Sequence, residues 1–354
     1  MKKTKHCKGC GLVLTTDINN ICYTKNLEND YCERCFNLMH YKTNTKAVQA
    51  MEIANQNVNE LKIDQDDFVF LVNDILNINF ELIKKYKNTS HLAFIFNKID
   101  LVLNRNNYEI IHNNLVRLLT SYGFTNPTIF LTSINNNYGI KNLNQFVIHL
   151  PLKQKQYFVG DTNAGKTSLI NRLMSLHYKH HEALVISPYL NTSLNYTKYK
   201  INKHTVIDCP GANYLANVLN YLSLEQKVNK LMNLKKAIKC HYLVKTNQAF
   251  IFDRFANLTI IPNDNCQVSF SLSLNIDIKR AKPDKLATNL KNLKSEFTFA
   301  KEQYQEFKYE LNDLDQTTTF QIMGLGHISI KNAKTVIINT YPTISIENFK
   351  GRIC

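Results

Sequence analysis

The chain has 354 residues, is 44% hydrophobic, and carries a formal net charge of +15 from 43 basic and 28 acidic residues. It is long enough for two or three domains with a sizeable core. No apolar run approaches the ~18 residues that a membrane span needs, which excludes a helical membrane protein. The positive charge favours a polyanionic partner such as nucleic acid, although a Lys- and Asn-rich compositional bias would give the same excess. Met1–His6 leads into cysteines instead of the apolar core of a signal peptide, so we expect a cytoplasmic protein.

Cysteine pairs mark the first 45 residues. The two C-x-x-C pairs are Cys7 with Cys10 and Cys32 with Cys35. Four thiolates can surround Zn²⁺ as a tetrahedron at ~2.3 Å, which makes a closed structural site. Disulfide or redox chemistry is the alternative, but cytosolic thiols stay reduced. We therefore predict a zinc-binding module over residues 1–45. Three nearby side chains are expected to be bystanders: Cys22, His6 and His40.

Short apolar runs of the kind shown by buried parallel strands follow between residues 51 and 150. They lie at Phe68–Val72, Leu92–Phe96 and Thr128–Leu131, with a helix predicted over Tyr108–Tyr122. This alternation of strand and helix predicts an α/β domain.

Two of these runs end in polar motifs. The second run leads into an N-K-x-D pattern formed by Asn97, Lys98 and Asp100, and the third leads into Thr132, Ser133 and Ile134. These resemble the two base-recognition motifs of GTPases. The carboxylate of Asp100 can accept from guanine N1–H and from the N2 amino group, whereas adenine has neither donor. The pattern therefore predicts guanine specificity; a P-loop ATPase in which N-K-x-D is accidental is an alternative.

The stretch after the apolar run Gln156–Val159 fits G-x-x-x-x-G-K-[ST] at every fixed position. Its residues are Gly160, Asp161, Thr162, Asn163, Ala164, Gly165, Lys166 and Thr167, followed by Ser168. The glycines let the backbone wrap a polyphosphate and lead into a helix N-terminus. Lys166 then reaches the β- and γ-phosphates, and the Thr167 hydroxyl ligates Mg²⁺. We predict a phosphate loop at this position.

A D-x-x-G pattern follows some forty residues later. Asp208 would hold Mg²⁺ through water, and the Gly211 N–H would meet the γ-phosphate. In the loop between the two motifs, around Ala183–Leu194, a hydroxyl can complete the Mg²⁺ shell. Lys166, Thr167, Asp208 and Gly211 are thus the candidate catalytic residues.

The base motifs come first along this chain and D-x-x-G comes last, which reverses the halves of an ordinary GTPase. Circular permutation explains this order, because the termini of such domains lie close together. The sequence here closely resembles the YqeH family of circularly permuted ribosome-assembly GTPases. The segments that carry the resemblance are Cys7–Cys10, Cys32–Phe36, His40–Tyr41, Asn97–Asp100, Gly160–Ser168, Asp208–Gly211 and Gly324–Ile328.

The resemblance implies further site residues. The P-G-T-T loop of the family is replaced by Leu190–Ser193, so the magnesium-binding threonine corresponds to Ser193, with Thr192 as the alternative. Ala212 follows the D-x-x-G glycine instead of the water-orienting glutamine of Ras-like enzymes, so intrinsic hydrolysis should be slow. Asn163 matches the asparagine that helps hold K⁺ in similar GTPases; the alternative is that it only shapes the loop.

Residues 224–354 show irregular strand-like runs. These are Ala249–Phe252, Leu258–Ile261, Val268–Leu272, Thr318–Met323 and Val336–Ile338. A charged stretch between Asp284 and Asp315 is expected to be helical. Gly324 and Gly326 should mark a bend between strands. The residues indicate a β-rich basic domain, and the family resemblance implies that it contacts RNA.

The sequence thus predicts an α/β circularly permuted P-loop GTPase domain over residues 46–223, between the zinc-knuckle module and the β-rich domain. It would bind GTP/GDP, Mg²⁺ and Zn²⁺, with K⁺ as a further cofactor, and would act on ribosomal RNA or the small ribosomal subunit. No membrane and no stable protein partner is indicated. A nonenzymatic ribosome-binding protein that only senses GTP or GDP is the main alternative.

Overall fold

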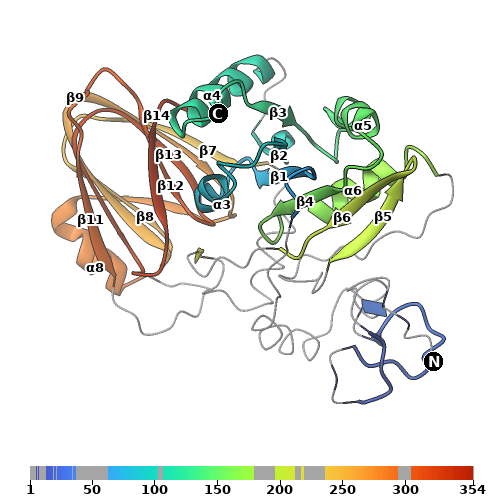
Figure 1. Ribbon diagram of the computed structural model, residues 1–354. Helices are drawn as coiled ribbons and strands as arrows, with labels where there is room; N and C mark the ends of the chain where they lie inside the picture. The colour runs from blue at the N-terminus through green and yellow to red at the C-terminus, as the bar shows by residue number, and fades with distance from the viewer. Residues whose placement is uncertain are drawn as a thin grey trace. The chain divides into compact units, whose positions relative to one another are not determined.

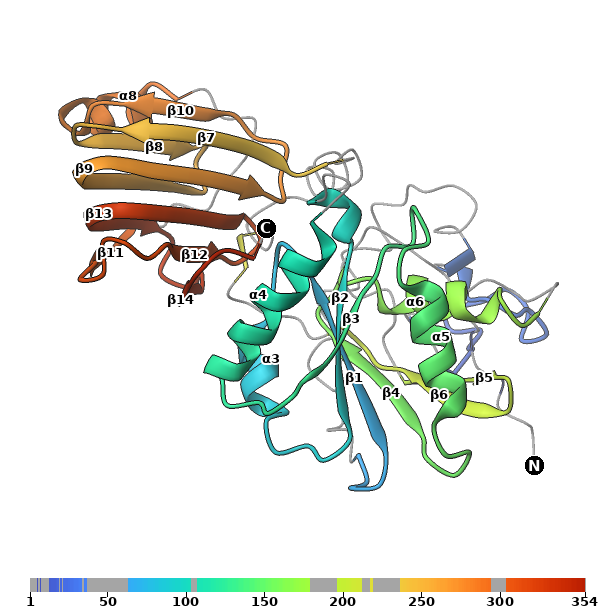
Figure 2. The same ribbon diagram turned by 90° about the horizontal axis from the view of Figure 1, so that it is seen from above.

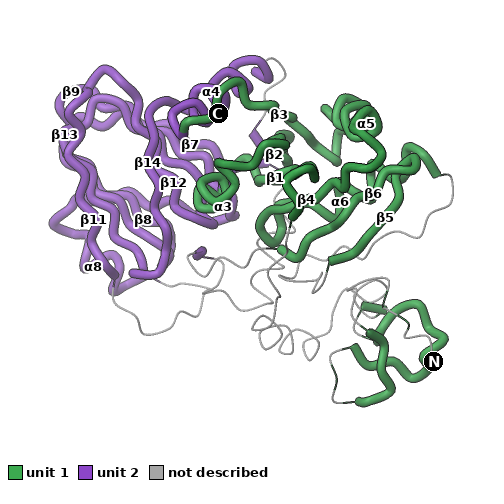
Figure 3. Tube along the Cα trace, viewed as in Figure 1, with its two compact units in different colours: residues 1–75, 79–100, 123–213 green, residues 76–78, 101–122, 214–354 purple. Residues whose placement is uncertain are grey.

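The computed structural model (Figure 1) describes residues 5, 7, 13–18, 20, 22–33, 35–36, 63–102, 107–178, 196–211, 217–218, 236–293 and 304–353. The chain divides into two compact units (Figure 3). The first comprises residues 1–75, 79–100 and 123–213, and the second comprises residues 76–78, 101–122 and 214–354. No helix in the described part of the chain is long and apolar enough to cross a membrane.

The first unit contains a six-stranded mixed sheet in the order β3-β2-β1-β4-β6-β5. Its strands are β1 Phe68–Asp74, β2 Leu92–Asn97, β3 Thr128–Leu131, β4 Gln156–Gly160, β5 Thr197–Ile201 and β6 His204–Asp208. Each neighbouring pair is parallel except β5 and β6, which are antiparallel. The α/β architecture predicted for this part of the chain is confirmed.

Burial on both faces explains why β1 reads as an uninterrupted apolar run. Every side chain from Phe68 to Asn73 is buried, as expected for a central parallel strand covered on both sides. Helices α5 (Ile140–His149) and α6 (Lys166–Met174) lie side by side (Figure 2) and contribute to one core with β1 and β4. The short helix α3 (Phe80–Lys85) begins at Asn79, whose side chain accepts from the Leu82 N–H.

The second unit contains an eight-stranded antiparallel sheet. The order is β10-β8-β9-β13-β12-β14, with β7 paired to β9 and β11 paired to β13. Its strands are β7 Ile238–Val244, β8 Gln248–Phe252, β9 Ala256–Leu272, β10 Ile278–Ala281, β11 Gln305–Glu310, β12 Thr318–Ile322, β13 Gly326–Thr340 and β14 Ile346–Lys350. The α-helices described in this unit are α4 (Tyr108–Ser121) and α8 (Leu286–Lys291). The predicted β-rich character is confirmed.

Three expectations for this unit meet different outcomes. The two runs predicted at Leu258–Ile261 and Val268–Leu272 belong to one long strand, β9. Glycines 324 and 326 do mark the turn between β12 and β13, with φ of 88° and 120°. The prediction of a helix between Asp284 and Asp315 is wrong for the part that forms β11. In β11 the aromatic residues alternate with polar ones, which is the period of a strand. Tyr309 of β11 packs against the sheet core.

Candidate nucleotide site and cysteine cluster

The phosphate loop joins β4 to α6 and takes the backbone shape that its glycine demands. Gly165 has φ of 94° and precedes the first residue of α6. A Cβ atom there would lie 2.3 Å from Asn97 Nδ2, so the position has no room for a side chain. Asn163, inside the loop, also has a positive φ of 64°. The loop therefore has the wrapped shape expected from its sequence.

The side chain of Lys166 contacts the backbone of this loop. Its Nζ donates to the carbonyl oxygens of Gly160 and Asp161, at 2.8 Å each. The residue is only 6% exposed. Burial lowers the pKa of the Lys166 ammonium, while the nearby carboxylates of Asp208 and Asp161 act in the opposite direction. This ammonium group can bind a polyphosphate, because phosphate oxygens can replace the two backbone carbonyls as its hydrogen-bond acceptors.

Thr167 and Asp208 meet although 41 residues separate them. The Thr167 hydroxyl donates to Asp208 Oδ2 at 2.7 Å. Asp208 is the last residue of β6 and is buried. A hydroxyl and a carboxylate beside a phosphate loop are the oxygen ligands that Mg²⁺ prefers. These two predicted magnesium residues fit the ion, whereas Ser193 and Thr192 lie outside the described residues.

Gly211 brings the D-x-x-G segment against the phosphate loop. A Cβ atom on Gly211 would lie 2.8 Å from both the backbone nitrogen and the Cα of Thr162. Real Cβ atoms do not approach backbone so closely, so only glycine fits without a shift of the loop. The two phosphate-binding motifs are therefore in direct contact.

Asn97 connects the base-recognition strands to the phosphate loop. Its Nδ2 donates to the Ala164 carbonyl at 3.0 Å, and its Oδ1 accepts from the Thr132 hydroxyl at 3.1 Å. Asn97 is 1% exposed and Thr132 is fully buried. One side chain thus joins the ends of β2 and β3 to the loop after β4.

The other two residues of the N-K-x-D motif also have polar partners. Lys98, with φ of 61°, forms a 2.8 Å ion pair with Asp74 at the end of β1. Asp100 accepts from the Asn135 side chain at 2.8 Å. A carboxylate has about four lone-pair positions, so Asp100 keeps acceptor capacity for a base.

A cavity of about 440 Å³ opens beside Asp100 and has the size of a small-molecule site. Its lining includes the predicted residues Asn97, Lys98, Asp100, Ile134, Gly165 and Ser168. It also includes Asn135, Asn171, Arg172 and Ser175, which the motifs did not indicate. The last three follow Ser168 at helical spacing along α6, and that periodicity is the signal that could have found them. Ser133 is buried beside the cavity residue Ile134 and receives the Asn136 N–H.

A hydrogen bond from Asn79 also supports the phosphate loop. The Asn79 side chain donates to Asp161 Oδ1 at 2.6 Å, and the Asn79 backbone N–H donates to Asn73 Oδ1 at 3.0 Å. Burial raises the pKa of Asp161 to about 6, against the effects of the Asn79 hydrogen bond and of Lys166. Asn79 carries no recognisable motif, so sequence reasoning could not assign it.

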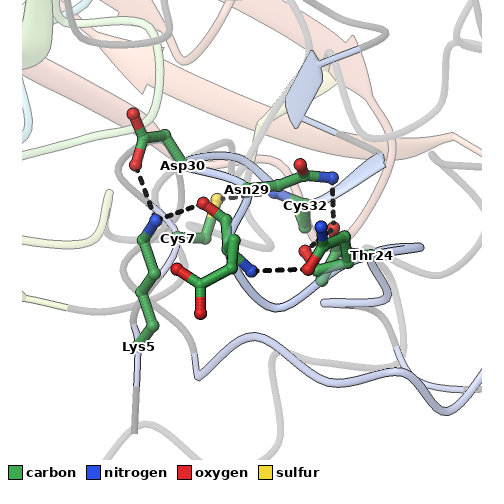
Figure 4. Close-up of polar contacts among 8 residues, drawn as sticks. Lys5, Cys7, Thr24, Asn29, Asp30 and Cys32 are labelled. Carbon is green, nitrogen blue, oxygen red and sulfur yellow. Dashed lines mark hydrogen bonds and ion pairs between the residues drawn. The ribbon is translucent and has the colours of Figure 1, made fainter. Parts of the chain in front are cut away.

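The N-terminal residues form a compact polar structure around buried cysteines (Figure 4). Lys5 pairs with Asp30 at 2.9 Å and donates to the Glu28 carbonyl, while Asn29 donates to the Thr24 hydroxyl. The Cys32 N–H donates to Cys7 Sγ at 3.2 Å (Figure 4).

Thiols gather within this structure, and the described ones include Cys22, which lies outside the predicted set. The Sγ atoms of Cys7, Cys22 and Cys32 all lie within 4.8 Å of one another. Cys35 is buried nearby, and its N–H donates to Cys32 Sγ at 3.5 Å. Cys10, His6 and His40 lie outside the described residues. Three adjacent buried sulfurs are a donor set that suits Zn²⁺.

Comparisons with known proteins agree with the site. Residues 155–262 match the family described as 50S ribosome-binding GTPase. The chain is 21% identical over 346 residues to the uncharacterized protein YqeH of Bacillus subtilis, covering 92% of this chain and 93% of that protein.

Two further relatives match a shorter part of the chain. Nucleolar GTP-binding protein 2 of Cryptococcus gattii is 32% identical over 143 residues, which cover 37% of this chain and 19% of that protein. Genetic interactor of prohibitins 3, mitochondrial, of Candida dubliniensis is 25% identical over 169 residues, which cover 42% of this chain and 25% of that protein. The match therefore spans a quarter or less of these two proteins. The chain thus contains a segment that matches a GTPase family described as ribosome-binding, and one of its relatives is named as a GTP-binding protein.

Proposed function

Because the resemblance to the YqeH family is confirmed over nearly the whole chain, we propose that this protein is a circularly permuted GTPase acting in assembly of the small ribosomal subunit. The hydrogen bond from Asn97 to the Ala164 carbonyl carries this proposal, since it joins the base motif to the phosphate loop. Guanine would lie in the cavity beside Asp100. The phosphates would lie on the loop from Gly160 to Thr167.

Strand order supports the permutation. The phosphate-loop strand β4 pairs with both β1 and β6, so it lies between the base-recognition half and the D-x-x-G half of the sheet. The ends of β1, β2, β3, β4 and β6 meet at one edge, because these strands are parallel. Ligands bind at that edge in open α/β sheets. This arrangement supports a nucleotide site whose motifs follow one another in permuted order along the chain.

Hydrolysis would use this chain's own groups around the bound nucleotide. Lys166 would bind the β- and γ-phosphates, and the Gly211 N–H would donate to a γ-phosphate oxygen. Thr167 and Asp208 would hold Mg²⁺, which neutralises charge developing on the phosphates. With Ala212 after the D-x-x-G glycine, no glutamine side chain orients water there, so the intrinsic rate is slow.

Asn163 is the proposed potassium ligand. Its amide nitrogen is buried without a hydrogen-bond partner. A rotation of this amide by about 180° would place its oxygen at the same buried position. An oxygen there is a ligand that K⁺ accepts. Turnover should therefore be faster in K⁺ than in Na⁺, and Asn163→Ala should remove that difference while retaining GDP binding.

The N-terminal module and the β-rich unit complete the proposal. Cys7 and Cys32, with further thiols of residues 1–45, would bind one structural Zn²⁺. The β-rich domain, proposed as residues 224–354, would contact ribosomal RNA; the net charge of +15 favours such a polyanion. The proposed location is the cytoplasm.

Nucleotide specificity provides the first test. GDP should bind at least a hundredfold more tightly than ADP, because adenine leaves Asp100 without its donors. Asp100→Asn should shift preference toward xanthine nucleotides, and the exposed Asp284→Asn should leave it unchanged. Equal binding of GDP and ADP by the unaltered protein would refute the site.

Turnover and co-sedimentation provide the second test. Purified protein with ribosomal subunits should hydrolyse GTP in K⁺, and should sediment with the small subunit in a nucleotide-dependent way. Tight GTP binding without any turnover would favour the nonenzymatic sensor. Sedimentation with the large subunit alone would overturn the small-subunit role.

A further inference from the structure

Cys22 lies outside both C-x-x-C pairs, yet its sulfur is part of the buried trio with Cys7 and Cys32. Their exposed fractions are 1%, 1% and 0%. Sulfurs bound to one tetrahedral Zn²⁺ at ~2.3 Å lie about 3.8 Å apart, and those of the trio all lie within 4.8 Å of one another. Small side-chain movements are enough to place all three on one ion.

The backbone holds Cys22 in this position from both sides. Its N–H donates to Asn20 Oδ1 at 2.9 Å, and its carbonyl accepts from the Thr15 N–H at 3.2 Å. Within the trio, the Cys32 N–H donates to Cys7 Sγ. This hydrogen bond fixes the position of the Cys7 sulfur beside Cys32.

Apolar packing alone does not explain this cluster. In the described part of residues 5–36, the buried apolar side chains are one leucine and four cysteines: Leu14, Cys7, Cys22, Cys32 and Cys35. Larger apolar side chains of the same segment are exposed: Val13, Ile18, Leu27 and Phe36. A segment that buries sulfur and exposes its larger apolar groups has the composition of a metal-held module.

We propose that Cys22 is a ligand of the N-terminal Zn²⁺, together with Cys7 and Cys32. This rests on the proposed zinc binding of residues 1–45 and changes its ligand set. Zn²⁺ in a structural site takes four ligands, and this segment contains five cysteines. With four cysteine ligands, one cysteine of the two C-x-x-C pairs would stay outside the coordination shell.

Cobalt substitution of the full-length protein tests this ligand. Co²⁺ absorption reports the number of thiolates, because replacing sulfur by oxygen or nitrogen shifts the d–d bands to shorter wavelength. Cys22→Ser should blue-shift these bands and weaken zinc affinity at least tenfold, since changes even at groups behind the ligands cost 10- to 100-fold. The control is Cys240→Ser, a partly exposed cysteine of β7, which should change neither.

Two outcomes would overturn the proposal, and they are distinguishable. If the unaltered protein binds zinc and Cys22→Ser shows the same affinity and cobalt spectrum, Cys22 is not a ligand although the zinc module stands. If the unaltered protein binds no zinc, the zinc module fails as well. Should Cys22→Ser not fold, Cys22→His decides: we expect stoichiometric metal and a spectrum of three sulfurs and one nitrogen, and an unchanged all-sulfur spectrum would refute the ligand.

Discussion

Replacing Thr132 by valine removes one hydroxyl from the junction of the base motif and the phosphate loop. Thr132 donates to Asn97 Oδ1 at 3.1 Å in a site where both residues are almost completely buried. Without that donor the amide oxygen of Asn97 is left unsatisfied, which costs about 1–3 kcal/mol. We expect Thr132→Val to lower the free energy of unfolding of the GTPase unit by that amount.

A double-mutant cycle separates this bond from other effects. Asn97→Ala also leaves the Ala164 carbonyl without its hydrogen-bond donor. It should therefore lower the free energy of unfolding by more than Thr132→Val does, by about 3 kcal/mol or more. Once Asn97 is absent, Thr132→Val should add little, and the coupling energy should approach the effect of Thr132→Val alone. GDP affinity should fall in both variants, because Asn97 no longer fixes the loop.

The chain has no tryptophan, so hydrogen exchange of β2 and β3 amides is the suitable assay. It also reports the GTPase unit separately from the β-rich unit. Thr128→Val is the matched control, since Thr128 is the exposed first residue of β3, the strand that Thr132 directly follows. As a surface substitution it should change stability by less than about 0.5 kcal/mol. If Thr132→Val matches Thr128→Val in exchange and in GDP affinity, the junction has no role.

Three further outcomes are expected. Gly165→Ala should weaken GDP binding at least about tenfold, because the new Cβ would meet Asn97 at a backbone shape that costs 1–2 kcal/mol for other residues; unchanged affinity by calorimetry would contradict this. Burial, with Asp208 beside it, raises the pKa of Cys209 to about 12, so maleimide at pH 8 should label Cys240 and spare Cys209 in the native protein, as peptide mass spectrometry can check. Chelation of zinc should unfold residues 1–45 alone, and a chelator effect on circular dichroism of the remaining domains would argue against an independent module.

Motif spacing predicted which strand ends would lie beside the phosphate loop. The runs that become β1, β2, β3 and β4 are buried on both faces or end at motifs, so their apolar sequence and their polar termini were both visible. Parallel strands then bring those termini to one edge without further information.

The sequence does not reveal which side chains from distant segments reach the site once the chain is folded. Asn79 reaches Asp161 across 82 residues, and Asn135 reaches Asp100 across 35. Asparagine is abundant in this chain, so neither residue differs from its neighbours in type. The β11 strand was missed because it lies in a charged stretch, and its pairing with β13 outweighs local propensity.

Cys22 shows a third kind of limit. A C-x-x-C pair is recognised from spacing because one short loop presents both sulfurs. Cys22 lies beside Cys7 and Cys32 because of how the chain folds between the two C-x-x-C pairs, where Thr15 and Tyr23 form a β-bridge. That path leaves no pattern in the sequence.

The order of strands in the first sheet has a consequence for synthesis. Strand β1 lies between β2 and β4, yet β4 begins 82 residues after Asp74, where β1 ends. At about 5–20 residues per second, the ribosome needs about 4–16 s to make that interval. During this time a nascent β1–β2–β3 sheet exposes the apolar strand Phe68–Asp74 as an open edge, the kind of surface that pairs with other chains. The strand that closes this edge is made late, so the edge of β1 is exposed to other chains for the whole of that interval.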